Sequence, residues 1–180
     1  RRFLHTSNAL QDGRVLVVGG VAASGSSQNS AEVFDTLWNP AASMATARES
    51  HTATLLGDGR VLVVGGSVSS GNPTALAEIY TPATGTWATA VPLHGPRSGH
   101  TATLLADGRV LVAGGEESSQ ALASAELYDP ADDTWTALPQ MSRPRRDHSA
   151  ALLPDGSVLV AGGASASGVP TNEAEVFDPR

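Results

Sequence analysis

Four of the five histidines recur at equivalent positions, His5, His51, His100 and His148. Histidine is a common metal ligand and acid–base group, so four of them around one axis would suggest a metal ring. Each, however, begins a copy of the same motif, written HTATLLADGRVLVAGG at 100–115. A site that is used once has no need to recur in every repeat. We therefore interpret these histidines as structural groups that bond to neighbouring backbone, and we expect neither a metal nor a cofactor.

Arginine and glutamate also recur once per repeat. An arginine precedes each histidine by three positions, and a glutamate follows in an Ala-Glu pair. An unpaired charge between packed elements would be costly, so we predict that the repeat arginines form salt bridges with repeat glutamates in the same or an adjacent repeat. The alternative is a ring of arginines that captures an anion. The sets are Arg2, Arg48, Arg97 and Arg145, and Glu32, Glu78, Glu126 and Glu175.

A second group of charged residues departs from the repeat. Arg143 and Arg146 flank Arg145 in QMSRPRRDHS, and an earlier segment carries Glu116 and Glu117. Planar arginines offer paired donors to carboxylates, so this cluster is a candidate site for an acidic peptide or a carboxylated sugar. His94, for which no other repeat has an equivalent, is a candidate neighbour at the edge of the same site. The alternative is a solvated loop whose charges pair with Asp147, Glu116 or Glu117.

The repeats that carry these residues span approximately 1–46, 47–95, 96–143 and 144–180, in a single region 1–180. Each contains a glycine pair that no helix follows, which argues against a phosphate-binding loop and favours close contacts between repeats and positive φ. The first three repeats also carry a tryptophan that we expect to pack between repeats near the outer edge. The glycine pairs are Gly19-Gly20, Gly65-Gly66, Gly114-Gly115 and Gly162-Gly163, and the tryptophans are Trp38, Trp87 and Trp135.

The second repeat shows the elements that position these residues. Residues 51–56 read as a strand, Asp58-Gly59 as a hairpin turn, 61–64 and 77–80 as two further strands, and Trp87 as the start of a fourth. We name the four strands of each repeat a to d. Strand b is continuously apolar, so it must be covered on both faces, and no helical pattern is available to cover it. Neighbouring repeats must do so, which predicts an all-β propeller of four-stranded antiparallel blades. A flat sandwich of meanders would instead predict alternation in strand b.

The motifs RSGHTATLLADGRVLVAGG and AELYDPADDTW resemble the kelch repeat, of the bacterial type also found in the propeller domain of galactose oxidase. The resemblance implies that strand a is innermost and that six or seven blades are usual. Two features depart from it: Trp38 follows Phe34 by four positions instead of seven, so the first c–d turn is shortened, and the fourth repeat reaches Arg180 before its tryptophan, so its strand d is absent. We expect part of a larger propeller, with a closed four-bladed ring or a dimer that pools eight blades as alternatives.

Composition narrows the function classes. The chain has 18 acidic residues against 11 arginines, a net charge of -7 and no cysteine. An acidic field disfavours nucleic-acid binding, and the apolar runs are too short to span a bilayer. Without cysteine, the tyrosine–cysteine cross-link of galactose oxidase cannot form. The start at Arg1 suggests a processed product or an excerpt, and kelch repeats of this type suggest an extracellular or cell-envelope location.

The two ends of the blades differ in sequence variability. The a–b turns are nearly invariant, whereas the b–c loops (21–30, 67–76, 116–124, 164–173) and d–a segments (39–47, 88–96, 136–144) share almost nothing. Variable loops on a rigid scaffold are where binding sites are usually built. We therefore predict a non-catalytic binding or scaffold module for a protein or carbohydrate ligand. The alternatives are a structural spacer and the propeller of a larger carbohydrate-active or oxidase-like enzyme, and open blade edges would allow self-association.

Overall fold

The computed structural model describes residues 2–68, 71–165 and 167–179, and within these ranges every regular element is a strand. Three four-stranded antiparallel sheets and one three-stranded sheet form the blades, and two short strand pairs lie in the loops. From inner to outer strand, the blades are β2 (Thr6–Ala9), β3 (Val15–Val18), β5 (Ala31–Phe34) and β6 (Trp38–Ala41); β7 (Thr52–Leu55), β8 (Val61–Val64), β9 (Ala77–Thr81) and β10 (Thr86–Ala90); β11 (Thr101–Leu104), β12 (Val110–Ala113), β15 (Ala125–Asp129) and β16 (Thr134–Leu138); and β17 (Ser149–Leu152), β18 (Val158–Ala161) and β19 (Ala174–Phe177). The main contacts between blades join the inner strands β2 to β7, β7 to β11 and β11 to β17.

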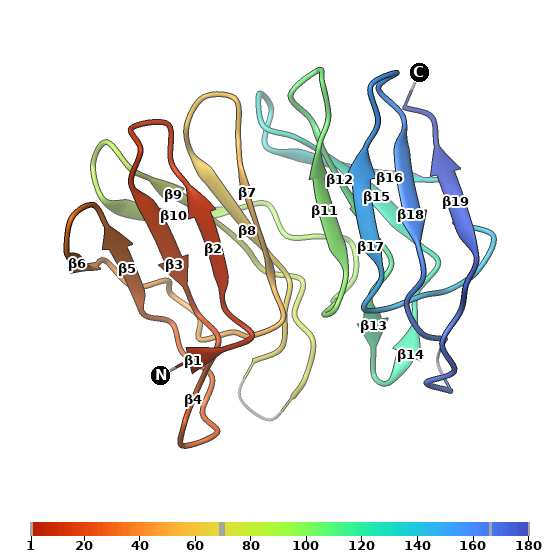
Figure 1. Cartoon of the computed structure of the whole chain (residues 1–180), viewed down its shortest axis with the longest axis horizontal. Coiled ribbons are helices and arrows are strands. Elements are labelled where there is room, and N and C mark those ends of the chain that lie inside the picture. Colours follow the sequence, from red (N-terminus) through yellow and green to blue (C-terminus); the bar gives the residue numbers. More distant parts are fainter. Residues whose placement is uncertain (1, 69–70, 166, 180) are drawn as a thin grey trace.

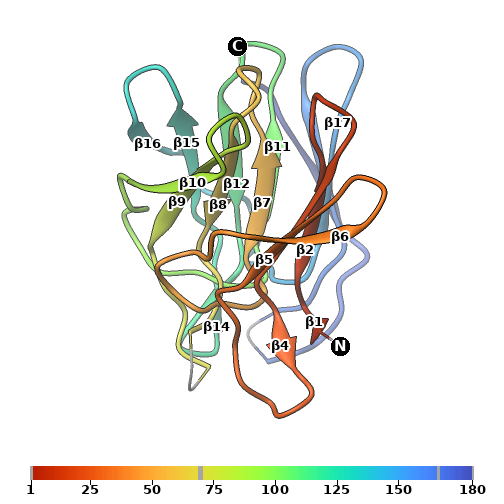
Figure 2. The same ribbon diagram turned by 90° about the vertical axis from the view of Figure 1, so that its left-hand side faces the viewer.

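The blades follow one another in sequence order (Figure 1), with β2 at one end of the row of inner strands and β17 at the other. The a–b turns lie at one end of the blades, and the b–c loops lie at the opposite end (Figures 1 and 2). These loops contain the short pairs β1 (Arg2–Phe3) with β4 (Val21–Ala22) and β13 (Glu116–Glu117) with β14 (Gln120–Ala121). The all-β propeller of antiparallel blades is thereby confirmed, and the variable segments share one face.

The continuous apolar run of strand b is explained by the two neighbours of each blade. In β8, Val61 and Val63 pack with Leu16 of the first blade, whereas Leu62 and Val64 pack with residues of the third blade such as Val110 and Val112. Alternate side chains of a strand point to opposite faces, so a strand that is covered on both faces needs apolar residues throughout. Burial at this level contributes about 1.5–3 kcal/mol for each such side chain.

The first and fourth blades depart from the others as the repeat spacing predicts. In the first blade Asp35, Thr36 and Leu37 suffice to join strands c and d, and Phe34 still pairs with Trp38. In the fourth blade, the described residues provide three strands and no strand d.

Each terminal blade also keeps one face exposed. Trp38 is 56% exposed on the first blade, and Val176 is 61% exposed on the fourth. A closed four-bladed ring would bury these faces against each other and does not describe this arrangement. A larger propeller and a dimer that pools eight blades stay predictions.

Candidate binding site

The repeat arginines and glutamates form a framework beneath the variable face, and its pairs are buried in the second and third blades. Arg48 is fully buried, and its Nη2 lies 2.7 Å from Oε1 of Glu78. Its Nη1 donates to the carbonyl oxygens of Gly65 and Leu76, at 3.1 and 2.8 Å. Burial lowers the pKa of Arg48, and the carboxylate of Glu78 opposes this effect. The same pairing occurs in Arg2–Glu32, Arg97–Glu126 and Arg145–Glu175.

The prediction of arginine–glutamate pairing is confirmed, and these arginines are not free to bind an anion. In the second, third and fourth blades the glutamate also holds the d–a segment that enters the blade. Oε2 of Glu78 accepts a hydrogen bond from the backbone N–H of Ala45 at 2.7 Å, and Oε2 of Glu175 accepts one from Ser142 at 2.6 Å. Burial would raise the pKa of Glu175, but donation from Ser142 and Arg145 outweighs it and leaves the pKa lowered.

The repeat histidines join consecutive blades through a threonine hydroxyl. Nε2 of His100 lies 2.9 Å from Oγ1 of Thr52, and the same contact joins His51 to Thr6 and His148 to Thr101. The expected backbone partner is therefore corrected to a side chain in the preceding blade.

These three histidines are buried and neutral. Burial lowers the pKa of His51 and of His100 to about 3, and that of His148 to about 4. Across residues 2–68, 71–165 and 167–179, no three His, Cys, Asp or Glu side chains gather in a way that could hold a metal ion. The histidines thus serve the joints between blades.

The glycine pairs allow the closest approach between adjacent chain segments. Gly65 and Gly66 have φ of +61° and +89°, and a Cβ atom at these positions would lie 2.6 Å from the carbonyl oxygen of Arg97 and 2.5 Å from that of Glu49. Neither approach leaves room for a side chain. The positive φ expected of the glycine pairs is confirmed in all four repeats, and the close contacts are confirmed except at Gly162, where the nearest atom to an added Cβ lies 3.8 Å away.

The variable b–c loops are held by a backbone pattern that recurs although their sequences differ. The residue after each repeat arginine pairs with the first loop residue, in the pairs Phe3–Val21, Glu49–Ser67, Ser98–Glu116 and Arg146–Ala164. In the second blade these backbone bonds measure 3.0 and 2.8 Å, and Thr74 N–H donates to the carbonyl oxygen of Gly66 at 2.8 Å. The face therefore presents different side chains on one repeated backbone.

A cleft of about 270 Å³ lies at the d–a end of the inner strands. We call it the axial cleft. It is lined by each repeat histidine and the residue that precedes it, namely Leu4, His5, Ser50, His51, Gly99, His100, Asp147 and His148.

The four residues that precede the histidines, which we call the rim residues, share a left-handed backbone. Their φ values are 54° at Leu4, 51° at Ser50, 60° at Gly99 and 53° at Asp147. They are joined in series, because the N–H of Ser50, Gly99 and Asp147 each donates to the carbonyl oxygen of the preceding rim residue, at 3.2, 3.2 and 2.8 Å. A non-glycine residue with positive φ carries local strain, which clusters at functional sites.

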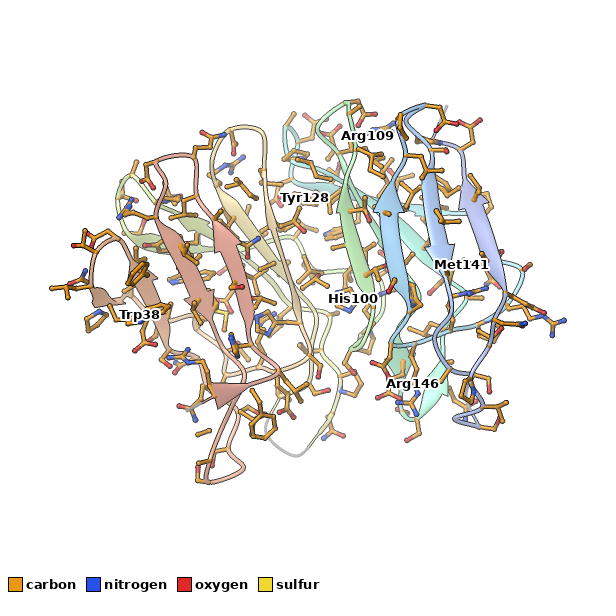
Figure 3. All side chains as sticks on the ribbon, in the orientation of Figure 1. Trp38, His100, Arg109, Tyr128, Met141 and Arg146 are labelled. Atoms are coloured by element: carbon orange, nitrogen blue, oxygen red, sulfur yellow. The ribbon has the colours of Figure 1, made fainter. Side chains whose placement is uncertain are left out.

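The arginine cluster predicted from the sequence is only partly assembled. Arg145 is fully buried, so its place in an exposed patch is wrong. Arg146 contacts Glu116 and Asp147, both at 3.3 Å, and lies at the end that carries the b–c loops (Figure 3). Arg143, with 67% of its side chain exposed, pairs instead with Glu173 at 3.0 Å.

His94 and Glu117 are placed differently from the rest of this cluster. Nδ1 of His94 lies 2.6 Å from Oε2 of Glu126, which also pairs with Arg97. Glu126 thus links His94, whose side chain is 61% exposed, to the framework of the third blade. Glu117, in β13, is half-buried.

The rim residues were not predicted from the sequence, because the candidate residues were taken from the repeated positions and from the charged loop. The signal that marks the rim residues is variation inside a repeated motif. Within the recurring Arg-x-x-His motif the two middle positions differ in every copy, as Phe-Leu, Glu-Ser, Ser-Gly and Arg-Asp. A variable pair between two fixed residues marks side chains that the scaffold does not use.

Antiparallel blades stacked around an axis, with a histidine and an arginine–glutamate pair repeated in each, define a repeat β-propeller. The model of the KLHDC2/KLHL20/DRC7 Kelch-repeats domain matches residues 4–180, and the chain belongs to the kelch-repeat family. Domains of this family generally act as protein-interaction modules and are typically non-catalytic. None of the curated proteins compared with the chain matches it. The described residues include no helix with the length and apolar character needed to cross a membrane.

Proposed function

We propose that this domain is a non-catalytic recognition module that binds a segment of a partner protein at the axial cleft. The observation that carries the proposal is the set of rim residues. They vary in type, share a left-handed backbone and meet in one cleft on a framework whose charged groups are already paired. A scaffold alone does not require variable side chains at the point where all four blades meet.

The rim suggests the chemistry of the partner. On the first blade Leu4 and the adjacent Phe3 are 53% and 54% exposed. On the fourth blade Asp147 has 63% of its side chain exposed and lies beside Arg146. A segment with an apolar side chain at one end and charged or hydrogen-bonding groups at the other fits this division. The acidic ligand first considered for the arginine cluster fits less well, because Arg143 and Arg146 each contact a carboxylate.

The test is to select peptides on the full chain and to measure their affinity for variants by fluorescence anisotropy. Asparagine tolerates positive φ, so Leu4→Asn and Asp147→Asn change the rim with little effect on the fold. We expect either variant to weaken binding at least about tenfold, the effect of losing about 1.4 kcal/mol.

A matched control lies at the opposite end of the blades. Asp58→Asn retains a turn sequence suited to the a–b hairpin and should leave affinity unchanged. Selected peptides that bind both rim variants as tightly as the natural chain would contradict the proposal. Binding confined to oligosaccharides would favour a carbohydrate ligand, and turnover of a sugar would favour the enzyme alternative.

A further inference from the structure

His94 stands at a position of the d–a segment where the framework requires only a backbone N–H. Alanine occupies this position before the second blade, so the joint forms without a polar side chain there. In three blades the residue at this position donates its N–H to Oε2 of the repeat glutamate, in the pairs Ala45–Glu78, His94–Glu126 and Ser142–Glu175 at 2.7, 2.9 and 2.6 Å. The imidazole of His94 is therefore an addition to the framework.

The ring of His94 is oriented through one of its two nitrogens. Nδ1 lies 2.6 Å from Oε2 of Glu126, whose side chain is only 4% exposed, and Oε1 of the same carboxylate accepts from Nη2 of Arg97 at 2.6 Å. A carboxylate accepts hydrogen bonds, so we assign the proton to Nδ1, and the neutral ring then has its lone pair on Nε2. Among the described residues no group bonds to Nε2 of His94, and 61% of the side chain is exposed. This nitrogen is thus accessible from solvent.

The other histidines lack this combination of an oriented Nδ1–H and an accessible Nε2. His51, His100 and His148 are buried, and the Nε2 of each contacts a threonine hydroxyl. His5 is exposed, but no ion pair of the described residues includes its ring. All four of these histidines line the axial cleft, whereas His94 does not. His94 is therefore a separate feature of the variable face, at the junction of the second and third blades.

A histidine whose Nδ1–H is held by a carboxylate presents Nε2 as an oriented nucleophile. We propose that His94 is a modification site whose Nε2 accepts a phosphoryl group from a small donor, an acyl phosphate or a phosphoramidate. The lone pair of Nε2 forms the bond to phosphorus as the bond from phosphorus to the leaving group breaks. The leaving group departs with that electron pair, as a carboxylate or as ammonia.

The surroundings of His94 suit this product. The ring becomes positively charged when Nε2 is phosphorylated, and Glu126 balances that charge through the hydrogen bond from Nδ1. Exposure of the side chain leaves the phosphoryl oxygens in water, where their hydration costs nothing to the fold. An acyl group on the same nitrogen would be removed by hydrolysis, so the phosphoryl group is the modification that persists.

The direct test treats the full 180-residue chain with potassium phosphoramidate and locates the product by phosphorus NMR and tandem mass spectrometry. We expect Nε2 of His94 to be phosphorylated at least about tenfold faster than His5, which is exposed without a carboxylate partner. His94→Gln should remove the fast reaction and leave that of His5 unchanged. Equal rates at the two histidines would overturn the proposal, as would a proton on Nε2 of His94 in long-range proton–nitrogen NMR spectra.

A gain of reactivity in the second blade tests the geometry with Glu78 and Arg48 intact. Ala45→His places an imidazole beside Glu78, at the position equivalent to His94. Ser43→His is the matched control, because Ser43 and Ala45 are both exposed in the same segment but only position 45 adjoins the glutamate. We expect Ala45→His to add a second fast site and Ser43→His to react at the rate of His5. Equal rates in these two variants, with the far-ultraviolet circular dichroism of the natural chain, would contradict the role of the glutamate.

Discussion

Mild acid should destabilise this domain through its three buried histidines. In the folded state the pKa of His51 and His100 is about 3 and that of His148 about 4, whereas an unfolded histidine has a pKa of about 6.5. Because the folded-state pKa is lowered, the unfolded state binds more protons as the pH falls below about 6.5. The stability that depends on the neutral histidines is therefore fully present above that pH and is lost as the pH falls below it.

The magnitude follows from the two protonation equilibria. Between about pH 7.5 and about pH 5.5 each unfolded histidine becomes mostly protonated, while each folded one stays neutral. Summed over this pH range, the difference in bound protons lowers the free energy of unfolding by about 1.4 kcal/mol per histidine, or about 4 kcal/mol for the three histidines. The whole free energy of unfolding of a domain is commonly only about 5–15 kcal/mol. Carboxyl groups whose pKa is lowered, such as Asp107 and Glu175, lose their contribution only below about pH 4.5 and fall outside this range.

The assay is urea unfolding at these two pH values for the natural chain and two variants. His100→Gln removes one titrating group, so the difference in unfolding free energy between the two pH values should fall from about 4 to about 3 kcal/mol. Thr52→Val removes the hydroxyl that contacts His100 but keeps the titrating ring, so it should lower stability at both pH values and leave the difference unchanged. An identical pH difference in the natural chain and His100→Gln would refute the reasoning.

Two further predictions concern the framework, and urea unfolding at neutral pH checks both. Arg48→Met leaves the buried carboxylate of Glu78 without its cation and should cost about 3–5 kcal/mol, whereas Arg60→Ala, which breaks an exposed pair with Asp58, should cost less than about 1 kcal/mol; equal losses would contradict the role of burial. Gly65→Ala adds a Cβ atom at positive φ and 2.6 Å from the carbonyl oxygen of Arg97 and should cost about 2–4 kcal/mol, while Gly57→Ala, with open space around it, should change stability little.

Much of the fold could be predicted because each local sequence pattern recurs in several repeats. Strand b of the second repeat was expected at 61–64 and observed at Val61–Val64, since an apolar run of that length admits few alternatives. The arginine–glutamate pairs followed from charge alone, because burying two opposite charges apart would leave each without a partner and destabilise the fold. The spacing of Phe34 and Trp38 likewise indicated the shortened turn.

The candidate site was harder to predict for physical reasons. Thr52 and His100 are 48 residues apart, so only the rotation from one blade to the next brings them together. Leu4 and Asp147 have a left-handed backbone because the geometry around the cleft repeats in every blade. Neither residue type prefers this conformation strongly enough for it to be predicted from the sequence. Arg145 is buried and Arg143 is exposed because opposite sides of one short segment face the blade and the solvent. The composition of the cluster does not show which arginine faces which side.

The threonine–histidine contacts have a consequence for how the domain opens. They link consecutive blades, so the domain resembles a linear array in which stability is approximately a sum of unit and neighbour terms. Among the described residues, the second and third blades each take part in two of these joints, and the first and fourth blades each take part in one. Leu4 belongs to the first blade and Asp147 to the last, and both line the axial cleft. A ligand that contacts both residues would link the first blade directly to the fourth, a connection that the threonine–histidine joints do not make, and would oppose any local opening that separates these two blades.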